Sequence, residues 1–276
     1  MSYKLLVVTF ADDVLQFRMF CYCLAKNWQG QRNLIVAMGK GTNPDIVKNI
    51  VQQHFDSTWT VEIFSTVPTN LGGDAEQQFN KIMRSIESGV DDVIVFDSKD
   101  FLLRACDIDV FVKKGKHRYT YRLPGKLINM GYDIGHIMDQ SVDHLPAVSN
   151  LTPWIWNTAQ LGQCWTHLNK KFGAYTHWTS FHAQSEIYSY YIYVWTQDPQ
   201  PIMFCQQQDS PLLFAGGYTH QTHAGMLREA DDFEKYPERM IWKHSRKLQD
   251  PRCLDVTKSV LEKHGIDSEF VQSVYG

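Results

Sequence analysis

A short polar segment directly follows an apolar run at 93–96 that reads VIVF, and it comprises Asp97, Ser98, Lys99 and Asp100. A continuous apolar run is typical of a strand that is buried on both faces. Because ligands of open α/β sheets bind outside the carboxyl ends of the strands, the segment is a candidate binding site. Two carboxylates can hold a divalent cation, since hard cations prefer oxygen ligands, and an ammonium group can contact a phosphate. An ordinary polar turn after a buried strand is the alternative interpretation.

Further polar side chains are expected at the same edge of the sheet. Thr9 and Asp12 stand at the end of the first apolar run of the chain. Gln78 and Lys81 share one face of a helix expected over 74–88, because residues three or four apart are neighbours on a helix surface. A lysine there can contact a diphosphate, and a glutamine can contact a base or a ribose. A solvated helix face explains the same spacing.

The elements that would position these residues follow from the hydrophobic pattern. Apolar runs predict four buried strands, at 4–10, 34–38, 59–64 and 93–96, and amphipathic segments between them predict helices. This alternation indicates parallel strands joined by right-handed crossovers. We therefore expect a Rossmann-like α/β fold, with a mixed, mainly parallel sheet flanked by helices.

Beyond residue 100 the pattern loosens, and we expect an irregular C-terminal half within a single domain over 1–276. Residues 154–172 and 182–195 are predicted to be helical, and the tail at 256–274 is predicted to form one or two helices. The six cysteines form no paired CxxC sets, so we expect free, buried thiols.

The composition excludes several classes of protein. Hydrophobic residues make up 43% and charged residues 21%, which is ordinary for a folded chain and argues against disorder. The net charge of -3 does not indicate nucleic-acid or membrane binding, so such a partner must be argued from a local patch. No run approaches the roughly 18 apolar residues of a membrane-spanning helix. The N-terminus lacks the cleavage site of a signal peptide, so we expect a cytoplasmic protein.

A basic segment at 113–126 reads KKGKHRYTYRLPGK and contains no acidic residue. Basic residues interleaved with aromatic rings suit a phosphate backbone and an unstacked base. Chemistry on a base within a duplex would require flipping the base out. A second basic stretch at 239–247 could extend this surface, whereas a solvated, lysine-rich hairpin explains the first one as well. The candidate acceptor-binding residues here are Lys113, Lys114, Lys116, Arg118 and Tyr119.

The order of several short motifs resembles the nucleotide-sugar-binding half of GT-A-fold glycosyltransferases. The motifs are TFADD at 9–13, GGDAEQQFNKI at 72–82 and VIVFDSKDFLL at 93–103. They are most similar to a bacterial and viral glycosyltransferase family whose fourth strand ends in Asp-Ser-Lys or Asp-Ser-Asp. Three later segments are similar to the same family, namely LTPWIW at 151–156, SEIYSYY at 185–191 and KHSR at 243–246.

The resemblance implies transfer of a sugar from a nucleotide-sugar donor to an acceptor hydroxyl. It implies a nucleotide-sugar-binding half at 1–106, an acceptor-binding and catalytic half at 107–255, and a helical tail at 256–276. The residues expected to bind the donor are Thr9, Asp12, Gln78, Lys81, Asp97, Ser98 and Lys99.

The resemblance also implies a divalent metal, Mn or Mg, that bridges the donor diphosphate as a Lewis acid. Asp97 would contact the ribose or the metal, and His244 would be a late ligand. The sequence departs from the family's Asp-x-Asp pattern, because Lys99 occupies the third place and Asp100 follows. Either Asp100 supplies the missing oxygen, or Lys99 replaces the metal as the positive charge. An additional residue of a basic helix is the alternative interpretation of His244.

Glu186 is the candidate catalytic base of an inverting transfer, which needs one carboxylate to take the proton of the acceptor hydroxyl. Its neighbours Phe181, Ile187, Tyr188 and Tyr191 would desolvate it and raise its pKa. An exposed glutamate on an amphipathic helix is the alternative.

The acceptor is open at this point. By the resemblance, some viral relatives are expected to glycosylate hydroxymethylated pyrimidines in DNA, which would suit a viral protein in the host cytoplasm. A surface glycan and a lipid-linked sugar are the alternatives. Trp154 and Tyr188 are further candidate acceptor contacts, because sugar faces stack on aromatic rings. A phosphohydrolase with an aspartate nucleophile and a non-catalytic nucleotide- or carbohydrate-binding module are the competing functions.

Overall fold

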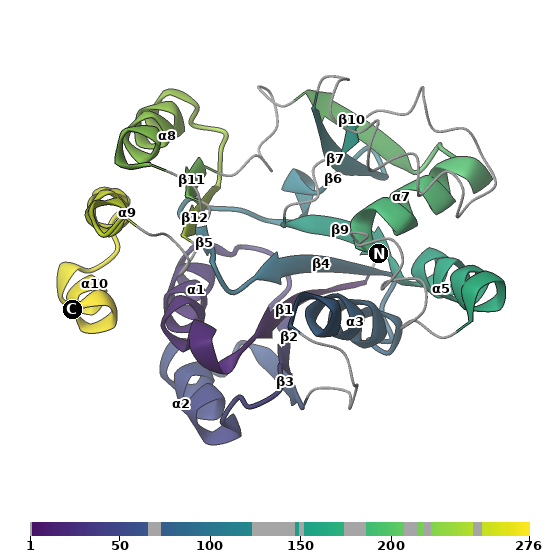
Figure 1. Cartoon of the computed structure of the whole chain (residues 1–276), viewed down its shortest axis with the longest axis horizontal. Helices are drawn as coiled ribbons and strands as arrows, with labels where there is room; N and C mark the ends of the chain where they lie inside the picture. Colours follow the sequence, from purple (N-terminus) through teal and green to yellow (C-terminus); the bar gives the residue numbers. More distant parts are fainter. Residues whose placement is uncertain are drawn as a thin grey trace.

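The computed structural model of the protein describes residues 2–65, 73–122, 147–148, 152–173, 186–206, 215–217, 222–244 and 250–276. Its central sheet has the order β3-β2-β1-β4-β9, in which the first four strands are parallel and the last is antiparallel to its neighbour (Figure 1). These strands are β1 (Tyr3–Thr9), β2 (Asn33–Met38), β3 (Thr60–Phe64), β4 (Asp92–Asp97) and β9 (Trp154–Asn157). The expected α/β fold with a mixed, mainly parallel sheet flanked by helices is therefore confirmed.

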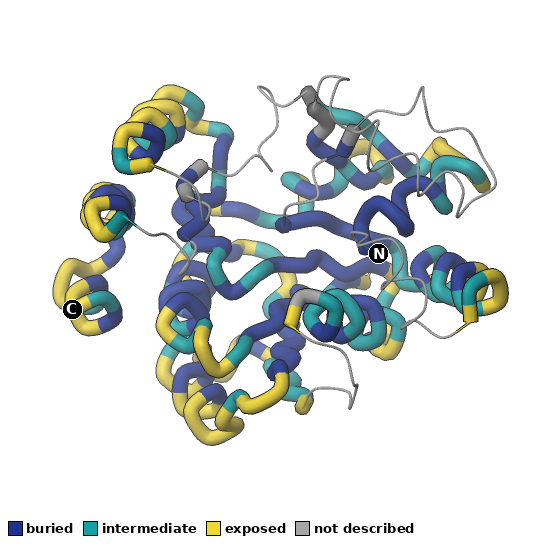
Figure 2. Tube along the Cα trace, in the orientation of Figure 1, coloured by how far each residue is buried: buried dark blue, intermediate teal, exposed yellow. Residues whose placement is uncertain are grey.

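Apolar cores lie on both faces of this sheet, because successive side chains of a strand point in opposite directions. Leu5 and Val7 of β1 join the core that contains α1 (Val14–Asn27) and α2 (Pro44–His54). Leu6 and Val8 join the core that contains residues of α3 (Gly73–Ile86), α5 (Thr158–Phe172) and α7 (Glu186–Gln197). Figure 2 shows the central strands buried and the outward faces of the helices exposed.

Two smaller sheets flank the central one. The first has the order β11-β12-β5, and β5 begins only three residues after β4 ends. Its strands are β5 (Asp100–Leu102), β11 (Ala215–Gly217) and β12 (Ile241–His244). The second contains β6 (Val112–Lys113), β7 (Lys116–Arg122), β8 (Ala147–Val148) and β10 (Ile202–Gln206). Further helices are η1 (Ala11–Asp13), η2 (Ile108–Val110), α8 (His223–Lys235), α9 (Arg252–Lys263) and α10 (Ser268–Tyr275).

The helix predicted over 154–172 begins four residues later, because its first residues form β9. Trp154 and Trp156 join one apolar core and Ile155 joins the other, which is the two-residue alternation of a strand. Asn157 then caps α5, since its side-chain oxygen accepts a hydrogen bond from the backbone N–H of Gln160 at 3.1 Å.

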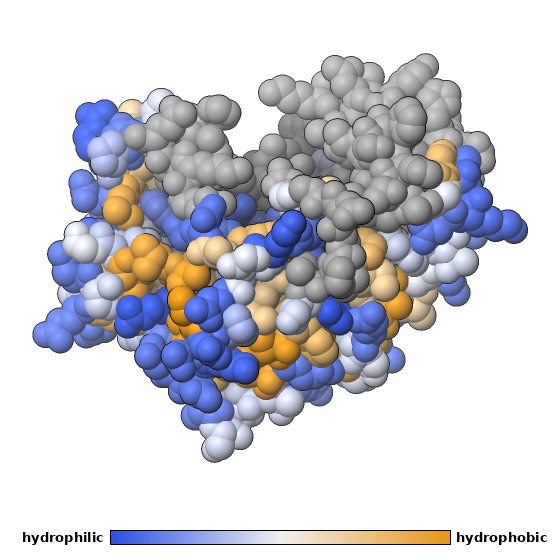
Figure 3. Space-filling model, turned by 60° about the horizontal axis from the view of Figure 1, so that its bottom comes forward, coloured by the Kyte–Doolittle hydropathy of each residue, from blue (hydrophilic) through white to orange (hydrophobic). Residues whose placement is uncertain are grey.

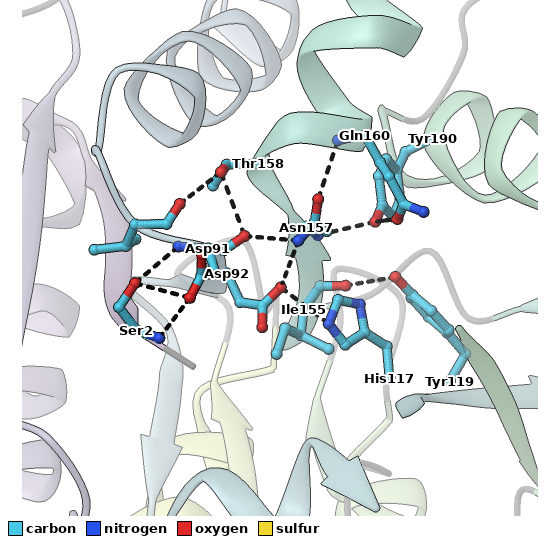
Figure 4. Close-up of polar contacts among 11 residues, drawn as sticks. Ser2, Asp91, Asp92, His117, Tyr119, Ile155, Asn157, Thr158, Gln160 and Tyr190 are labelled. Atoms are coloured by element: carbon cyan, nitrogen blue, oxygen red, sulfur yellow. Dashed lines mark hydrogen bonds and ion pairs between the residues drawn. The ribbon is translucent and has the colours of Figure 1, made fainter. Parts of the chain in front are cut away.

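Polar contacts join the sheet of β7 and β10 to the central sheet (Figure 4). His117 of β7 lies with its Nε2 atom 3.1 Å from Oδ1 of Asp92, the first residue of β4. Asn157 donates from its side chain to the same carboxylate at 3.2 Å, and its backbone N–H donates to the hydroxyl of Tyr190. Tyr119 donates its hydroxyl proton to a backbone carbonyl of β9. These contacts fix β7 and the part of α7 around Tyr190 beside the amino-terminal end of β4.

Three large apolar side chains of the described residues are exposed, namely Leu15, Ile46 and Leu227. Figure 3 shows hydrophobic areas interrupted by hydrophilic residues on one face of the molecule. All six cysteines are free, and five of them are buried, whereas Cys205 is half-buried. No helix in the described ranges is long and apolar enough to cross a membrane.

Candidate active site

The polar segment after β4 forms the turn that connects the central sheet to β5. Asp100 stabilises this turn, because its Oδ2 atom accepts a hydrogen bond from the backbone N–H of Asp97 at 2.7 Å. The backbone carbonyl of Lys99 accepts a hydrogen bond from the backbone N–H of His244 at 3.2 Å. Ser98 is buried within the turn. The backbone of the segment is therefore held by its own side chains and by β12.

Three ammonium groups surround the carboxylate of Asp97. The Nζ atom of Lys81 lies 2.8 Å from its Oδ1 atom, and the Nζ atoms of Lys99 and Lys243 lie 3.5 and 3.8 Å from its Oδ2 atom. Gln77 also donates a hydrogen bond to Oδ1 at 3.3 Å. Burial raises the pKa of Asp97, but the three lysines outweigh burial and hold this pKa well below its usual range. Asp97 is therefore ionised.

Lys81 connects Asp97 to the candidate base. Its Nζ atom lies 3.4 Å from the Oε1 atom of Glu186, the first residue of α7, and 5.0 Å from the ring centre of Trp154. Lys81 and Glu186 are only 3% and 5% exposed, so water screens their contact little. Burial lowers the pKa of Lys81, and the two carboxylates overcome this and raise the pKa above its ordinary value. Burial raises the pKa of Glu186, and Lys81 opposes that rise.

A second buried ion pair lies below the turn. The Nζ atom of Lys243 is 2.5 Å from the Oδ1 atom of Asp100, and both residues are fully buried. The same ammonium group donates to the hydroxyl of Thr152 at 3.0 Å. Burial raises the pKa of Asp100, and Lys243 opposes the shift. Five segments that are distant in the sequence thus meet here: the β4–β5 turn, α3, residues 152–154, the start of α7 and β12.

The residues expected to hold a divalent metal do not fit one in this arrangement. Asp100 directs both carboxylate oxygens to the backbone of Asp97 and to Lys243. His244 neighbours Lys243 on β12, so its side chain points to the opposite face of the strand. Its Nδ1 atom lies 3.0 Å from the hydroxyl of Thr257, and burial lowers its pKa to about 4. Among the described residues, no group of three or more His, Cys, Asp and Glu side chains could hold a metal ion.

The other predicted donor-binding residues lie at or near the carboxyl edge of the sheet. Thr9 ends β1 and is buried, and Asp12 lies in η1 and is exposed. Gln78 is half-buried on α3. The sequence predicted Gln78 as a donor-binding residue, but the glutamine that contacts Asp97 is Gln77. The spacing could have identified it, because Gln77 stands four residues before Lys81 and shares its helix face.

Of the predicted acceptor-binding residues, Trp154 lies at this edge, beside Lys81, but the basic ones do not. Lys113 and Lys114 are exposed at the β6–β7 hairpin, beside His117, which contacts Asp92. Asp92 and Asp97 are the two ends of β4, so about 16 Å of strand separates them. The hairpin therefore lies toward the amino-terminal edge of the central sheet.

The remaining acceptor candidates lie along β7, α7 and β9. Lys116 donates a hydrogen bond to Gln200, and Arg118 donates one to the sulfur of Cys205. The aromatic candidates are all buried: Tyr119 bonds to the backbone of β9, Tyr188 donates its hydroxyl to the carbonyl of Val148 at 3.1 Å, and Trp154 packs beside Lys81. In the second basic stretch, Arg239 and Lys243 are buried, and residues 245–247 lie outside the described part.

Comparisons with known proteins identify the fold. No protein-family model and no curated protein sequence matches the chain. Its structure is similar to that of WbbM, a bifunctional glycosyltransferase, with a TM-score of 0.55 at 10% identity over 99% of this chain and 51% of WbbM. The alignment with mouse xyloside xylosyltransferase 1 has a TM-score of 0.48 at 9% identity over 91% of this chain and 100% of that protein. The chain thus spans about half the length of WbbM, and its fold is one that a glycosyltransferase uses.

Proposed function

We propose that the protein is a glycosyltransferase that moves a sugar from a nucleotide-sugar donor to an acceptor hydroxyl with inversion at the anomeric carbon. The supporting observation is the Lys81 ammonium group, which contacts both Asp97 at the end of β4 and Glu186 at the start of α7. One carboxylate thus lies at the strand edge where α/β folds bind ligands, and a second, buried one lies close to it. The similarity to WbbM agrees with this proposal at the level of fold.

Glu186 is the proposed base. Its carboxylate accepts the proton of the acceptor hydroxyl while that oxygen forms a bond to the anomeric carbon. The bond between the anomeric carbon and the diphosphate oxygen breaks, and its electron pair leaves with the nucleoside diphosphate. Burial strengthens Glu186 as a base by raising its pKa, and Lys81 keeps the ionised form accessible by opposing that shift.

Hydroxymethylated pyrimidine in DNA and a surface glycan are the two acceptor classes to compare. The exposed lysines of the β6–β7 hairpin suit a phosphate backbone, but they lie toward the opposite edge of the sheet from Asp97. A duplex that reached both regions would have to cover the length of β4. A mass-spectrometric screen of nucleotide sugars against hydroxymethylated DNA and simple glycans distinguishes these acceptors.

The same screen tests the base. Glu186→Gln keeps the side-chain shape, and it should reduce transfer by about 10²–10⁴-fold while donor affinity changes by less than about threefold. Glu62→Gln is a matched control, because Glu62 also pairs with a lysine, Lys4 at 2.6 Å, but lies on β3. Glu62→Gln should retain activity. Full turnover by Glu186→Gln would contradict the assignment, and hydrolysis of an aryl phosphate without sugar transfer would favour a phosphohydrolase.

A further inference from the structure

We infer that lysine ammonium groups take the place of a divalent cation at the donor diphosphate, and that Lys99 is the lysine that contacts it. The inference rests on the proposed glycosyltransferase function and identifies how that site compensates the charge of its donor. It follows from three features of the cluster formed by Asp97, Asp100, Glu186, Lys81, Lys99 and Lys243: its occupied oxygens, its charge balance and the exposure of one lysine.

The carboxylate oxygens that a metal would need are already in contact with cations or donors. Asp97 has Lys81 and Gln77 at its Oδ1 atom and two further lysines at its Oδ2 atom. Asp100 has the backbone N–H of Asp97 at one oxygen and Lys243 at the other. A divalent cation bound here would have to displace buried ammonium groups, which would leave those groups without their counterions.

The charges of the described cluster balance. It contains three lysines and three carboxylates. The carboxylates are those of Asp97, Asp100 and Glu186. Because the cluster is neutral overall, its most exposed charge decides which ion it attracts. That charge is the ammonium group of Lys99, which repels a cation and attracts an approaching diphosphate. Ammonium groups are common ligands of phosphate and act as point charges.

Lys99 is the lysine that a ligand can reach. Its side chain is 32% exposed, compared with 4% for Lys81 and 0% for Lys243. Its backbone is held by the turn and by β12, so the flexible stem starts from a fixed position. When Lys99 turns from Asp97 to a phosphate, Asp97 keeps Lys81 at 2.8 Å and Lys243 at 3.8 Å. The movement therefore leaves no buried carboxylate without a counterion.

This arrangement also serves the departure of the nucleotide. Negative charge grows on the diphosphate as the bond to the sugar breaks, and a positive group already in position stabilises that charge. Lys99 supplies the contact, while Lys81 and Lys243 hold the side chains of Asp97 and Asp100 in place. Donor binding should accordingly weaken as salt concentration rises.

Calorimetric titration of the full chain with UDP, GDP, CDP and ADP tests the inference, each titration being run in EDTA and again in excess MnCl₂. At least one nucleotide should bind in EDTA, and manganese should change its Kd by less than about twofold. Lys99→Ala should weaken binding by about tenfold or more, as expected for loss of a charged hydrogen bond. Lys99→Arg should stay within about threefold of the unaltered chain. Lys48→Ala removes an exposed lysine of α2, which packs on the opposite face of the central sheet from α3, and it should leave binding unchanged.

The possible failures are distinguishable. Binding that requires manganese would overturn the inference and leave the proposed function standing. Binding in EDTA that Lys99→Ala does not weaken would overturn the role of Lys99. If none of the four nucleotides bound in either buffer, the proposed function itself would fail, and the inference with it.

Discussion

Lys81→Met removes an ammonium group shared by two carboxylates, and the structure indicates what this costs. The Nζ atom of Lys81 lies 2.8 Å from Asp97 and 3.4 Å from Glu186. After the substitution Asp97 keeps Lys99 and Lys243 as neighbours. Among the described residues, Glu186 forms an ion pair with Lys81 alone, so its buried charge would be left uncompensated.

Removing one partner of a buried ion pair costs about 3–5 kcal/mol, and we expect a loss of this size near pH 7. Burial raises the pKa of Glu186 and Lys81 opposes the rise, so this pKa increases further in Lys81→Met. A group whose folded-state pKa is raised contributes stability that is greatest below its unfolded-state pKa and is lost as pH rises through the folded-state value. The cost should therefore be smaller near pH 5 than near pH 7.

Urea denaturation at both pH values measures this effect. Lys4→Met is the control, because Lys4 and Glu62 form an ion pair whose side chains are 17% and 37% exposed. The control should lose less than about 1 kcal/mol. Lys81→Met combined with Glu186→Gln should be more stable than Lys81→Met alone, since the uncompensated charge is then absent. A loss below about 1 kcal/mol for Lys81→Met, or one that does not depend on pH, would refute the reasoning.

Three further predictions concern the surroundings of the site. Burial lowers the pKa of His244 to about 4, so the free energy of unfolding should fall by roughly 3 kcal/mol as pH drops from about 6.5 toward 4. Denaturation curves of His244→Gln should lack this pH-dependent loss. Lys99→Asp should weaken nucleotide binding in EDTA and make it responsive to manganese, because it replaces an ammonium group with an oxygen ligand; calorimetry would show both changes. Gly216→Ala should lower the free energy of unfolding by more than about 2 kcal/mol, since its Cβ would lie within van der Waals overlap of the Lys243 backbone at a φ of +112°. Gly225→Ala, in the helix α8, is not subject to that positive φ and serves as its comparison in thermal melts.

The strands of the central sheet could be predicted because each one is buried on both faces. The runs expected at 4–10, 34–38, 59–64 and 93–96 coincide within two residues with β1, β2, β3 and β4. Residues 154–157 were misassigned because two tryptophans and an isoleucine before a helix fit an apolar helical face as well as a strand. The pairing of β9 with β4 decides between the two, and that contact joins residues about 60 positions apart.

The charge pattern of the site could be predicted only in part. Asp97 could be predicted as a site residue because it ends a strand, and Lys81 because it lies on a polar helix face. Their mutual contact could not be predicted, because it depends on how α3 packs against the sheet. The sequence places Lys243 in a basic stretch that could extend an acceptor-binding surface, and it gives no sign that this lysine is buried, because lysine is almost never fully buried unless it is paired. Its partner, Asp100, stands 143 residues earlier, and the antiparallel pairing of β12 with β5 brings the two together.

The cost of burying this cluster supports a functional role for it. Buried ion pairs contribute little net stability, and apolar residues of similar volume often give a fold that is equally stable or more so. The contacts around Asp92 at the other end of β4 join two sheets, which gives them a structural purpose. The lysine cluster joins elements as well, but it also leaves Lys99 partly exposed at the edge where ligands of α/β sheets bind. An ion pair with a purely structural role does not need a lysine that can leave its carboxylate and bind another anion. A diphosphate-binding site does need such a lysine.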